Sequence, residues 1–150
     1  MIEIRIPGGE TLRFEHLVLD YNGTLARDGK LLPGVRERIE ALASHLGVHV
    51  VTADTFGRAR EEMAGIPCEV SVLPPEGHRV LGLGASGVAA IGNGRNDRLM
   101  LEAAALGIAV VEGEGAAPET VLAADVVCRS ALDALDLLLE PKRLVATLRT

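Results

Sequence analysis

The chain has 150 residues, 48% of them apolar and 24% charged, which is the composition of one ordinary globular domain. Its formal net charge of −6 excludes the broad positive surface that binding to nucleic acid or to an anionic membrane requires. Phe14, Tyr21 and Phe56 are its only aromatic residues, so a base-stacking surface is excluded as well. Small phosphorylated molecules are still compatible with this charge.

No apolar run reaches the roughly 18 residues that a membrane span needs, and Met1 leads directly into an alternating segment rather than a signal sequence. We therefore expect a cytoplasmic protein with no membrane insertion. Cys68 and Cys128 have neither the spacing of metal ligands nor the number that a disulfide framework needs. We expect both to be small buried apolar residues.

The first 15 residues predict a β-hairpin, because apolar residues alternate on both sides of a Pro-Gly-Gly-Glu turn at 7–10. After it, the pattern changes to short continuous apolar runs, which are typical of strands buried on both faces. These runs occupy residues 17–19, 48–51, 70–73, 88–91, 108–111 and 126–127.

Helices are predicted between and after these strands, at residues 35–46, 56–64, 97–106, 118–123, 131–139 and 142–149. In the third of them, Leu99, Met100, Ala103 and Leu106 should face inward. Alternating strands and helices with short connections predict an α/β fold, a doubly wound, three-layer, Rossmann-like parallel sheet. The whole chain, 1–150, is predicted to be one domain, with an N-terminal hairpin (1–15), a core (16–128) and C-terminal helices (129–150).

Polar residues end three of the apolar runs. Asp20 ends the first, Thr52 ends the second, and Gly92 to Asp97 follow the fourth. Ligands of open parallel sheets bind outside the carboxyl ends of the strands, so these residues are the first candidates for a functional site.

The segment Asp20 to Leu25 resembles the D-x-D-G-T-L/V signature of the haloacid dehalogenase (HAD) superfamily. Thr52 is similar to the second motif of that family. Gly92 to Asp97 resemble the G-D-G-x-N-D form of the fourth motif, which the phosphorylation domain of P-type ATPases shares. The resemblance runs from about residue 16 to about residue 128, with the motifs in the family's order.

The resemblance implies Mg²⁺-dependent phosphoryl transfer through an aspartyl phosphate. It implies that Asp20 is the nucleophile and a Mg²⁺ ligand, together with the main-chain carbonyl of Asn22, Asp97, and Asn93 directly or through water. It also implies a phosphate site. The residues of that site would be Thr52, Ala53, Gly23 and Asn93.

Three chemical positions depart from the family pattern. Asn22 stands where the family has the Asp that exchanges a proton with the leaving group and with water, and an amide can do neither. Asn93 replaces another Asp, which removes a negative charge from the metal surroundings. The Lys of the third motif is missing, and of the two basic residues in that window, His78 and Arg79, we choose Arg79 as the predicted substitute, although its charge is more spread.

The spacing between motifs leaves no room for a cap domain, so the site should be open. Capless members of the family tend to act on macromolecules or to cover the site by oligomerisation. The partners we consider are therefore a small phosphorylated molecule or a phosphoprotein, and a homodimer is plausible because residues 135–139 are apolar.

Simpler interpretations exist for each feature. Asn22-Gly23 is a favourable type I′ turn. Asp97 could be a helix cap with no catalytic role, and Thr52 could be an ordinary strand residue. The G-x-G-x-x-G sequence at 82–87 runs into a strand rather than out of one, which argues against a dinucleotide site. The histidines are scattered, and residues 112–115 form a loop that could border the site.

Two functions follow. The first is a Mg²⁺-dependent phosphohydrolase, slow because of Asn22. The alternative is a catalytically degenerate module that binds phosphate and metal and serves in regulation.

Overall fold

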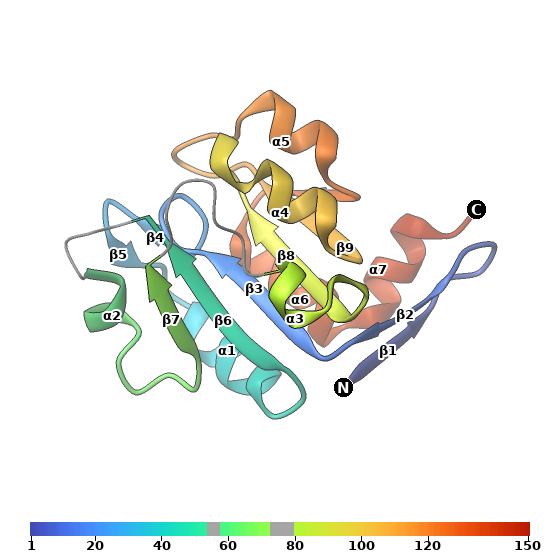
Figure 1. The fold of residues 1–150 in the computed structure, drawn as a ribbon, viewed down its shortest axis with the longest axis horizontal. Helices are drawn as coiled ribbons and strands as arrows, with labels where there is room; N and C mark the ends of the chain where they lie inside the picture. Colours follow the sequence, from blue (N-terminus) through green and yellow to red (C-terminus); the bar gives the residue numbers. More distant parts are fainter. Residues whose placement is uncertain (54–57, 73–79) are drawn as a thin grey trace.

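The computed structural model describes residues 1–53, 58–72 and 80–150. Its centre is a six-stranded parallel sheet with the strand order β10-β9-β8-β3-β6-β7 (Figure 1). The strands are β3 (His16–Asp20), β6 (Gly47–Thr52), β7 (Glu69–Val72), β8 (Val88–Gly92), β9 (Leu106–Val110) and β10 (Val126–Cys128). All the strands predicted from apolar runs are present, although Leu73 lies outside the described residues.

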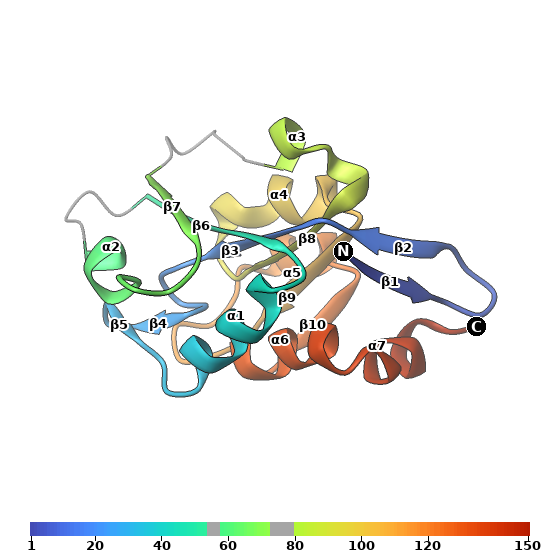
Figure 2. The ribbon, with the colours of Figure 1, turned by 90° about the horizontal axis from the view of Figure 1, so that it is seen from below.

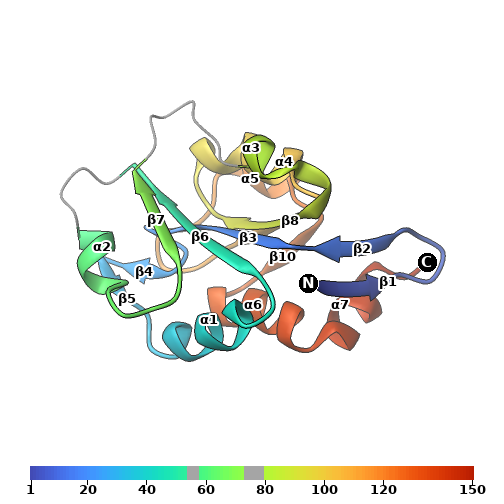
Figure 3. The ribbon, with the colours of Figure 1, turned by 60° about the horizontal axis from the view of Figure 1, so that its bottom comes forward.

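Helices cover both faces of this sheet (Figures 2 and 3). One face carries α1 (Val35–Ala43), α2 (Arg58–Glu62), α6 (Ala131–Leu139) and α7 (Pro141–Leu148), and the other carries α3 (Val80–Leu83), α4 (Arg98–Ala103) and α5 (Pro118–Ala123). The predicted doubly wound, three-layer α/β fold is confirmed. Within the described residues, neither long connection that follows β3 or β6 holds a separate cap.

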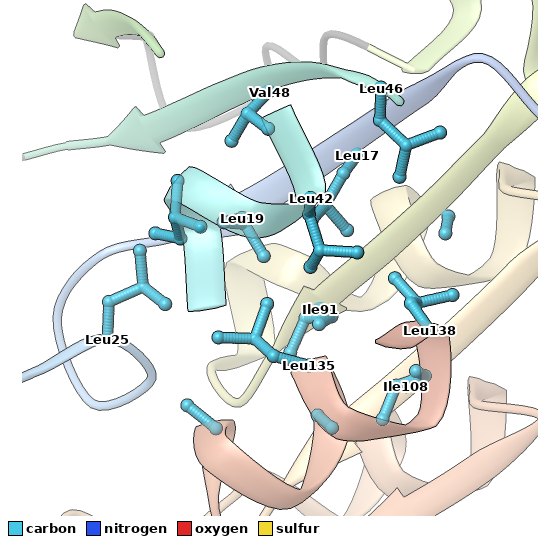
Figure 4. Packing of buried hydrophobic residues seen from close by; sticks show 14 of the residues in the cluster. Leu17, Leu19, Leu25, Leu42, Leu46, Val48, Ile91, Ile108, Leu135 and Leu138 are labelled. Atoms are coloured by element: carbon cyan, nitrogen blue, oxygen red, sulfur yellow. The ribbon is translucent and has the colours of Figure 1, made fainter. Parts of the chain in front are cut away.

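The larger core lies between the sheet and the α1–α6 layer (Figure 4). Leu17 and Leu19 of β3 point into it and meet Leu135 of α6, and all three are fully buried. Val18, between those two leucines, faces the smaller core under α4, where it joins Met100 and Leu101. Strands with both faces buried explain why the sequence shows continuous apolar runs rather than alternation.

Two small hairpins flank the sheet. The predicted N-terminal hairpin is confirmed as β1 (Ile2–Arg5) paired with β2 (Thr11–Phe14). The second, β4 (Ala26–Arg27) with β5 (Lys30–Leu31), was not predicted. It turns at Asp28 and Gly29, whose φ angles of 53° and 80° are those of a type I′ turn. The Asp-Gly pair was the signal for it.

The third predicted helix is wrong in part. Helix α4 ends at Ala103, Leu106 already begins β9, and Leu99 is 48% exposed rather than inward. Gly107 packs so closely on the carbonyl of Leu101 that a Cβ there would lie 2.4 Å from it. The chain must therefore leave the helix early to bring the strand against it.

Other expectations have mixed outcomes. Residues 56–57 of the second predicted helix lie outside the described residues, and α2 begins at Arg58. The glycines at 82–87 do precede a strand, β8, and both cysteines are free and half-buried. Across the described ranges, no helix is long and apolar enough to cross a membrane.

Candidate active site

The buried polar side chains of the described residues gather at one place, the carboxyl ends of β3 and its two neighbours. Asp20 pairs with Val51 in the sheet, and Leu19 pairs with Ile91. Thr52, the last residue of β6, and Asn93, which follows β8, therefore lie just beyond the level of Asp20. These buried residues are Asp20, Thr24, Thr52, Asn93, Asp97 and Thr120. The three strand ends that the sequence singled out therefore meet in space.

Asp20 and Asp97 form the centre of the site. Only 8% of Asp20 and 5% of Asp97 is exposed, and the two carboxyl groups lie close enough to affect each other's pKa. Burial, and then the negative charge of Asp97, hold the pKa of Asp20 well above its ordinary value. Burial also raises the pKa of Asp97. Two carboxyl groups in this position favour a shared proton or a bound cation.

Backbone donors hold Asp97 in place. Its Oδ2 accepts hydrogen bonds from the N–H groups of Asn93 (3.0 Å) and Gly94 (2.9 Å), and these bonds oppose the effect of burial on its pKa. A Cβ on Gly92 would lie 2.6 Å from the same oxygen, so only glycine fits there. Asp97 also precedes α4, but its side chain does not cap that helix, so the capping interpretation is wrong.

Thr24 is a site residue that the sequence analysis missed. Its buried hydroxyl lies 3.2 Å from Oδ2 of Asp20 and 3.3 Å from Oδ1 of Asn93, and its single proton can go to either oxygen. Thr24 lies in the segment that resembles the family signature, but the sequence alone predicts no role for it. It links the nucleophile candidate to the loop after β8.

Asn93 is tied to its surroundings through both ends of its amide. Its Nδ2 donates to the carbonyl of Gly115 (3.0 Å), while its Oδ1 faces Thr24. Gly23, at φ +78°, packs so tightly that a Cβ would lie 2.3 Å from that Nδ2. The loop at 112–115 thus borders the site, as the sequence suggested.

The other predicted site residues have different surroundings. Thr52 is buried at the end of β6, whereas Ala53 and Asn22 are exposed. Asn22 does not turn a hairpin of its own, because three successive N–H groups, those of residues 24–26, converge on the carbonyl of Tyr21. Arg79 lies outside the described residues.

The available donors are those of a hard cation. Carboxylate, amide and carbonyl oxygens are the ligands that Mg²⁺ prefers, and it keeps several waters. Among the described residues, no group of three or more His, Cys, Asp or Glu side chains could hold a metal. The site offers two carboxylates, which fits a cation that completes its sphere with other oxygens.

Comparison with known proteins gives a consistent result. Residues 78–134 match the family model of haloacid dehalogenase-like hydrolases. An uncharacterized protein of Methanocaldococcus jannaschii, MJ0073, is 53% identical over 62 residues, which cover 41% of this chain and 67% of that protein.

Two solved structures share the fold. The cobalt-bound deoxy-D-mannose-octulosonate 8-phosphate phosphatase of Haemophilus influenzae has a TM-score of 0.73 at 16% identity, over 92% of this chain and 94% of that one. The 3-deoxy-D-manno-octulosonate 8-phosphate phosphatase of Moraxella catarrhalis, in complex with magnesium, phosphate and its sugar, has a TM-score of 0.68 at 16% identity, over 89% and 92%. The chain therefore shares the fold of these two phosphatases, and its residues 78–134 are similar to haloacid dehalogenase-like hydrolases.

Proposed function

We propose that this chain is a Mg²⁺-dependent phosphohydrolase that acts through an aspartyl phosphate on Asp20. The observation that carries the proposal is the buried Asp20–Asp97 pair at the carboxyl edge of the sheet. A pair of buried carboxyl groups is costly for stability, and proteins keep such pairs mainly where chemistry or a cation requires them.

In the first step, a carboxylate oxygen of Asp20 attacks phosphorus, and the bond from phosphorus to the leaving oxygen breaks. The electron pair of that bond departs with the leaving group. Because the amide of Asn22 supplies no proton, the group must leave as an anion. Substrates with stable leaving anions, such as acyl phosphates and aryl phosphates, should therefore react faster than alkyl phosphates.

In the second step, water attacks phosphorus, the bond to Asp20 breaks, and both protons of the water end on the inorganic phosphate, which leaves as H₂PO₄⁻. Thr24 would hold the regenerated Asp20 carboxylate through its hydroxyl. Thr52, Gly23 and the backbone N–H of Ala53 would hold the phosphoryl oxygens, with Arg79 as the added cation. Mg²⁺, held by Asp20, Asp97, the carbonyl of Asn22 and, directly or through water, Asn93, would supply neutralisation of the phosphoryl charge.

The test is phosphate release from p-nitrophenyl phosphate and acetyl phosphate, with and without Mg²⁺, for the wild type and Asp20→Ala. We expect release that needs the metal and that Asp20→Ala abolishes. Release that is equal in the variant would contradict the mechanism. Equal turnover of acetyl phosphate and an alkyl phosphate would contradict the role of Asn22.

A second candidate is a degenerate module that binds phosphate and metal without turnover. The double anchoring of Asn93 on Gly115 and near Thr24 favours it, because this amide is already used to hold the loop. Binding of Mg²⁺ with beryllofluoride, a phosphoryl mimic, in a chain that releases no phosphate would support this candidate.

A further inference from the structure

The β4–β5 hairpin carries two positive charges, on Arg27 and Lys30, and one negative charge, on Asp28 in its turn. Arg27 and Lys30 lie directly opposite each other in its register, and both are exposed. Directly opposed residues project to the same side of a hairpin, so these two cations repel each other and destabilise it. Over residues 1–53, 58–72 and 80–150, neither one forms an ion pair.

The hairpin is part of the wall of the candidate active site. Ala26 forms a bridge with Asn22, and the N–H of Gly23 donates to the carbonyl of Ala26 (3.0 Å). Arg27 therefore directly follows Ala26, the residue bridged to Asn22. In the proposed mechanism, Asn22 is the residue that faces the leaving group. The arrows of β3 and β6 point toward this hairpin in Figure 1.

Arg27 also contacts the opposite wall. A Cβ on Gly113 would lie 3.0 Å from Cζ of Arg27, so the guanidinium rests on the glycine backbone of the loop that anchors Asn93. Glu112 is turned toward α6, where its carboxylate accepts a hydrogen bond from the N–H of Ala131. Glu114 also lines this contact, but it forms no ion pair with Arg27 in the described part of the chain.

Arg58 is a third cation close to this hairpin. A Cβ on Gly29 would lie 2.9 Å from Nε of Arg58, so the first residue of α2 packs on the turn of the hairpin. Three exposed cations thus lie around this turn, against Asp28 within it and Glu62, whose carboxylate accepts a hydrogen bond from the N–H of Leu31 (3.4 Å). Local conflicts that lower stability without a packing benefit are typical of functional sites.

We propose that Arg27 and Lys30 bind a second anionic group, a carboxylate or a phosphate, on the leaving-group side of the substrate. The substrate class is then a phosphorylated compound that is already an anion beyond the phosphoryl group transferred. This inference rests on the proposed phosphohydrolase function.

The test compares two chromogenic substrates that differ by one group, p-nitrophenyl phosphate and 3-carboxy-4-nitrophenyl phosphate, with ADP as the arm for a second phosphate. The variant is Arg27→Gln with Lys30→Gln. The matched control is Lys142→Gln with Arg149→Gln, which removes the same charge from exposed positions at the other end of the molecule.

We expect wild type and control to prefer the carboxylated substrate or ADP over p-nitrophenyl phosphate in kcat/KM, and the hairpin variant to lose about tenfold of that preference. If the variant loses its preference only for the carboxylated substrate, the second group is a carboxylate. If it loses its preference only for ADP, the second group is a phosphate. An unchanged ratio overturns the proposal. A variant that has lost stability would show it in its thermal midpoint, which we expect to be equal to or above that of the wild type.

Absence of phosphate release by the wild type would overturn the proposed function and not this inference. In that case, calorimetry of 3-carboxy-4-nitrophenyl phosphate binding decides. We expect the hairpin variant to bind it about tenfold more weakly than the control does, relative to p-nitrophenyl phosphate. Equal relative affinities would overturn the inference.

Discussion

The two ends of the central sheet are built from different kinds of residue. At the amino end, the strands meet the β1–β2 hairpin and α7, and the buried side chains, such as Ile4, Phe14 and Leu144, are apolar. Backbone hydrogen bonds close this end, including Glu15 N–H to Gly87 O at 2.8 Å. At the carboxyl end, the buried side chains also include carboxyl, hydroxyl and amide groups.

This difference has an energetic meaning. Apolar burial at the amino end stabilises the fold, whereas burial of Asp20 beside Asp97 lowers its stability. We therefore expect substitutions at the two ends to separate activity from stability. Substitutions at the carboxyl end should change turnover without unfolding the protein. Substitutions at the amino end should lower stability without changing the turnover of the folded protein.

The largest gain in turnover should come from Asn22→Asp. A carboxyl group at this exposed position can protonate the leaving group and accept a proton from water, and such catalysis is worth about 10²–10⁴-fold. Turnover of an alkyl phosphate should rise by about that factor, and turnover of acetyl phosphate much less. Steady-state kinetics with both substrates measure this. No change with either one would mean that Asn22 does not occupy the position we give it.

At the amino end, Phe14→Ala should lower the free energy of unfolding by about 3–5 kcal/mol, because it empties a fully buried aromatic site in the larger core. Turnover per folded molecule should stay as in the wild type. Urea denaturation and active-site titration measure the two quantities. If Phe14→Ala does not fold, Phe14→Leu, with a smaller loss, carries the same test. A large fall in turnover of the folded variant would contradict the separation of the two ends.

Asp20→Asn should abolish turnover and yet stabilise the metal-free protein at pH 7, because it removes a buried negative charge beside Asp97. The folded pKa of Asp20 lies above the unfolded value, so the folded wild type loses stability as pH rises through the interval between the two values. The variant should lack this loss. Thermal unfolding between pH 4 and 8 without metal measures it, and Mg²⁺ should raise the midpoint of the wild type only. A variant less stable than the wild type at pH 7 would contradict the destabilising effect of the buried Asp20 charge beside Asp97.

The sequence predicted the sheet and the meeting of Asp20, Thr52 and Asp97 because both depend on short-range patterns, apolar runs and the residues that end them. The β4–β5 hairpin had a local signal too, the Asp28-Gly29 pair, whereas Thr24 escaped prediction for a different reason. A hydroxyl acquires a role only when a residue far along the chain, here Asn93, is brought beside it. The early end of α4 likewise depends on the contact of Gly107 with the carbonyl of Leu101, which no local pattern encodes.

The smallest effect concerns the joint between the core and the β4–β5 hairpin. The hydroxyl of Tyr21 donates to the carbonyl of Gly29 (2.8 Å), and its ring is fully buried below the hairpin. Tyr21→Phe should keep the ring packed and cost about 1 kcal/mol. The loss should be local, so amide exchange of residues 26–31 should quicken while that of β3 stays the same, and the preference for a second anion should weaken with it. Uniformly faster amide exchange across the sheet would instead mean that the Tyr21 hydroxyl stabilises the whole fold and not the hairpin alone.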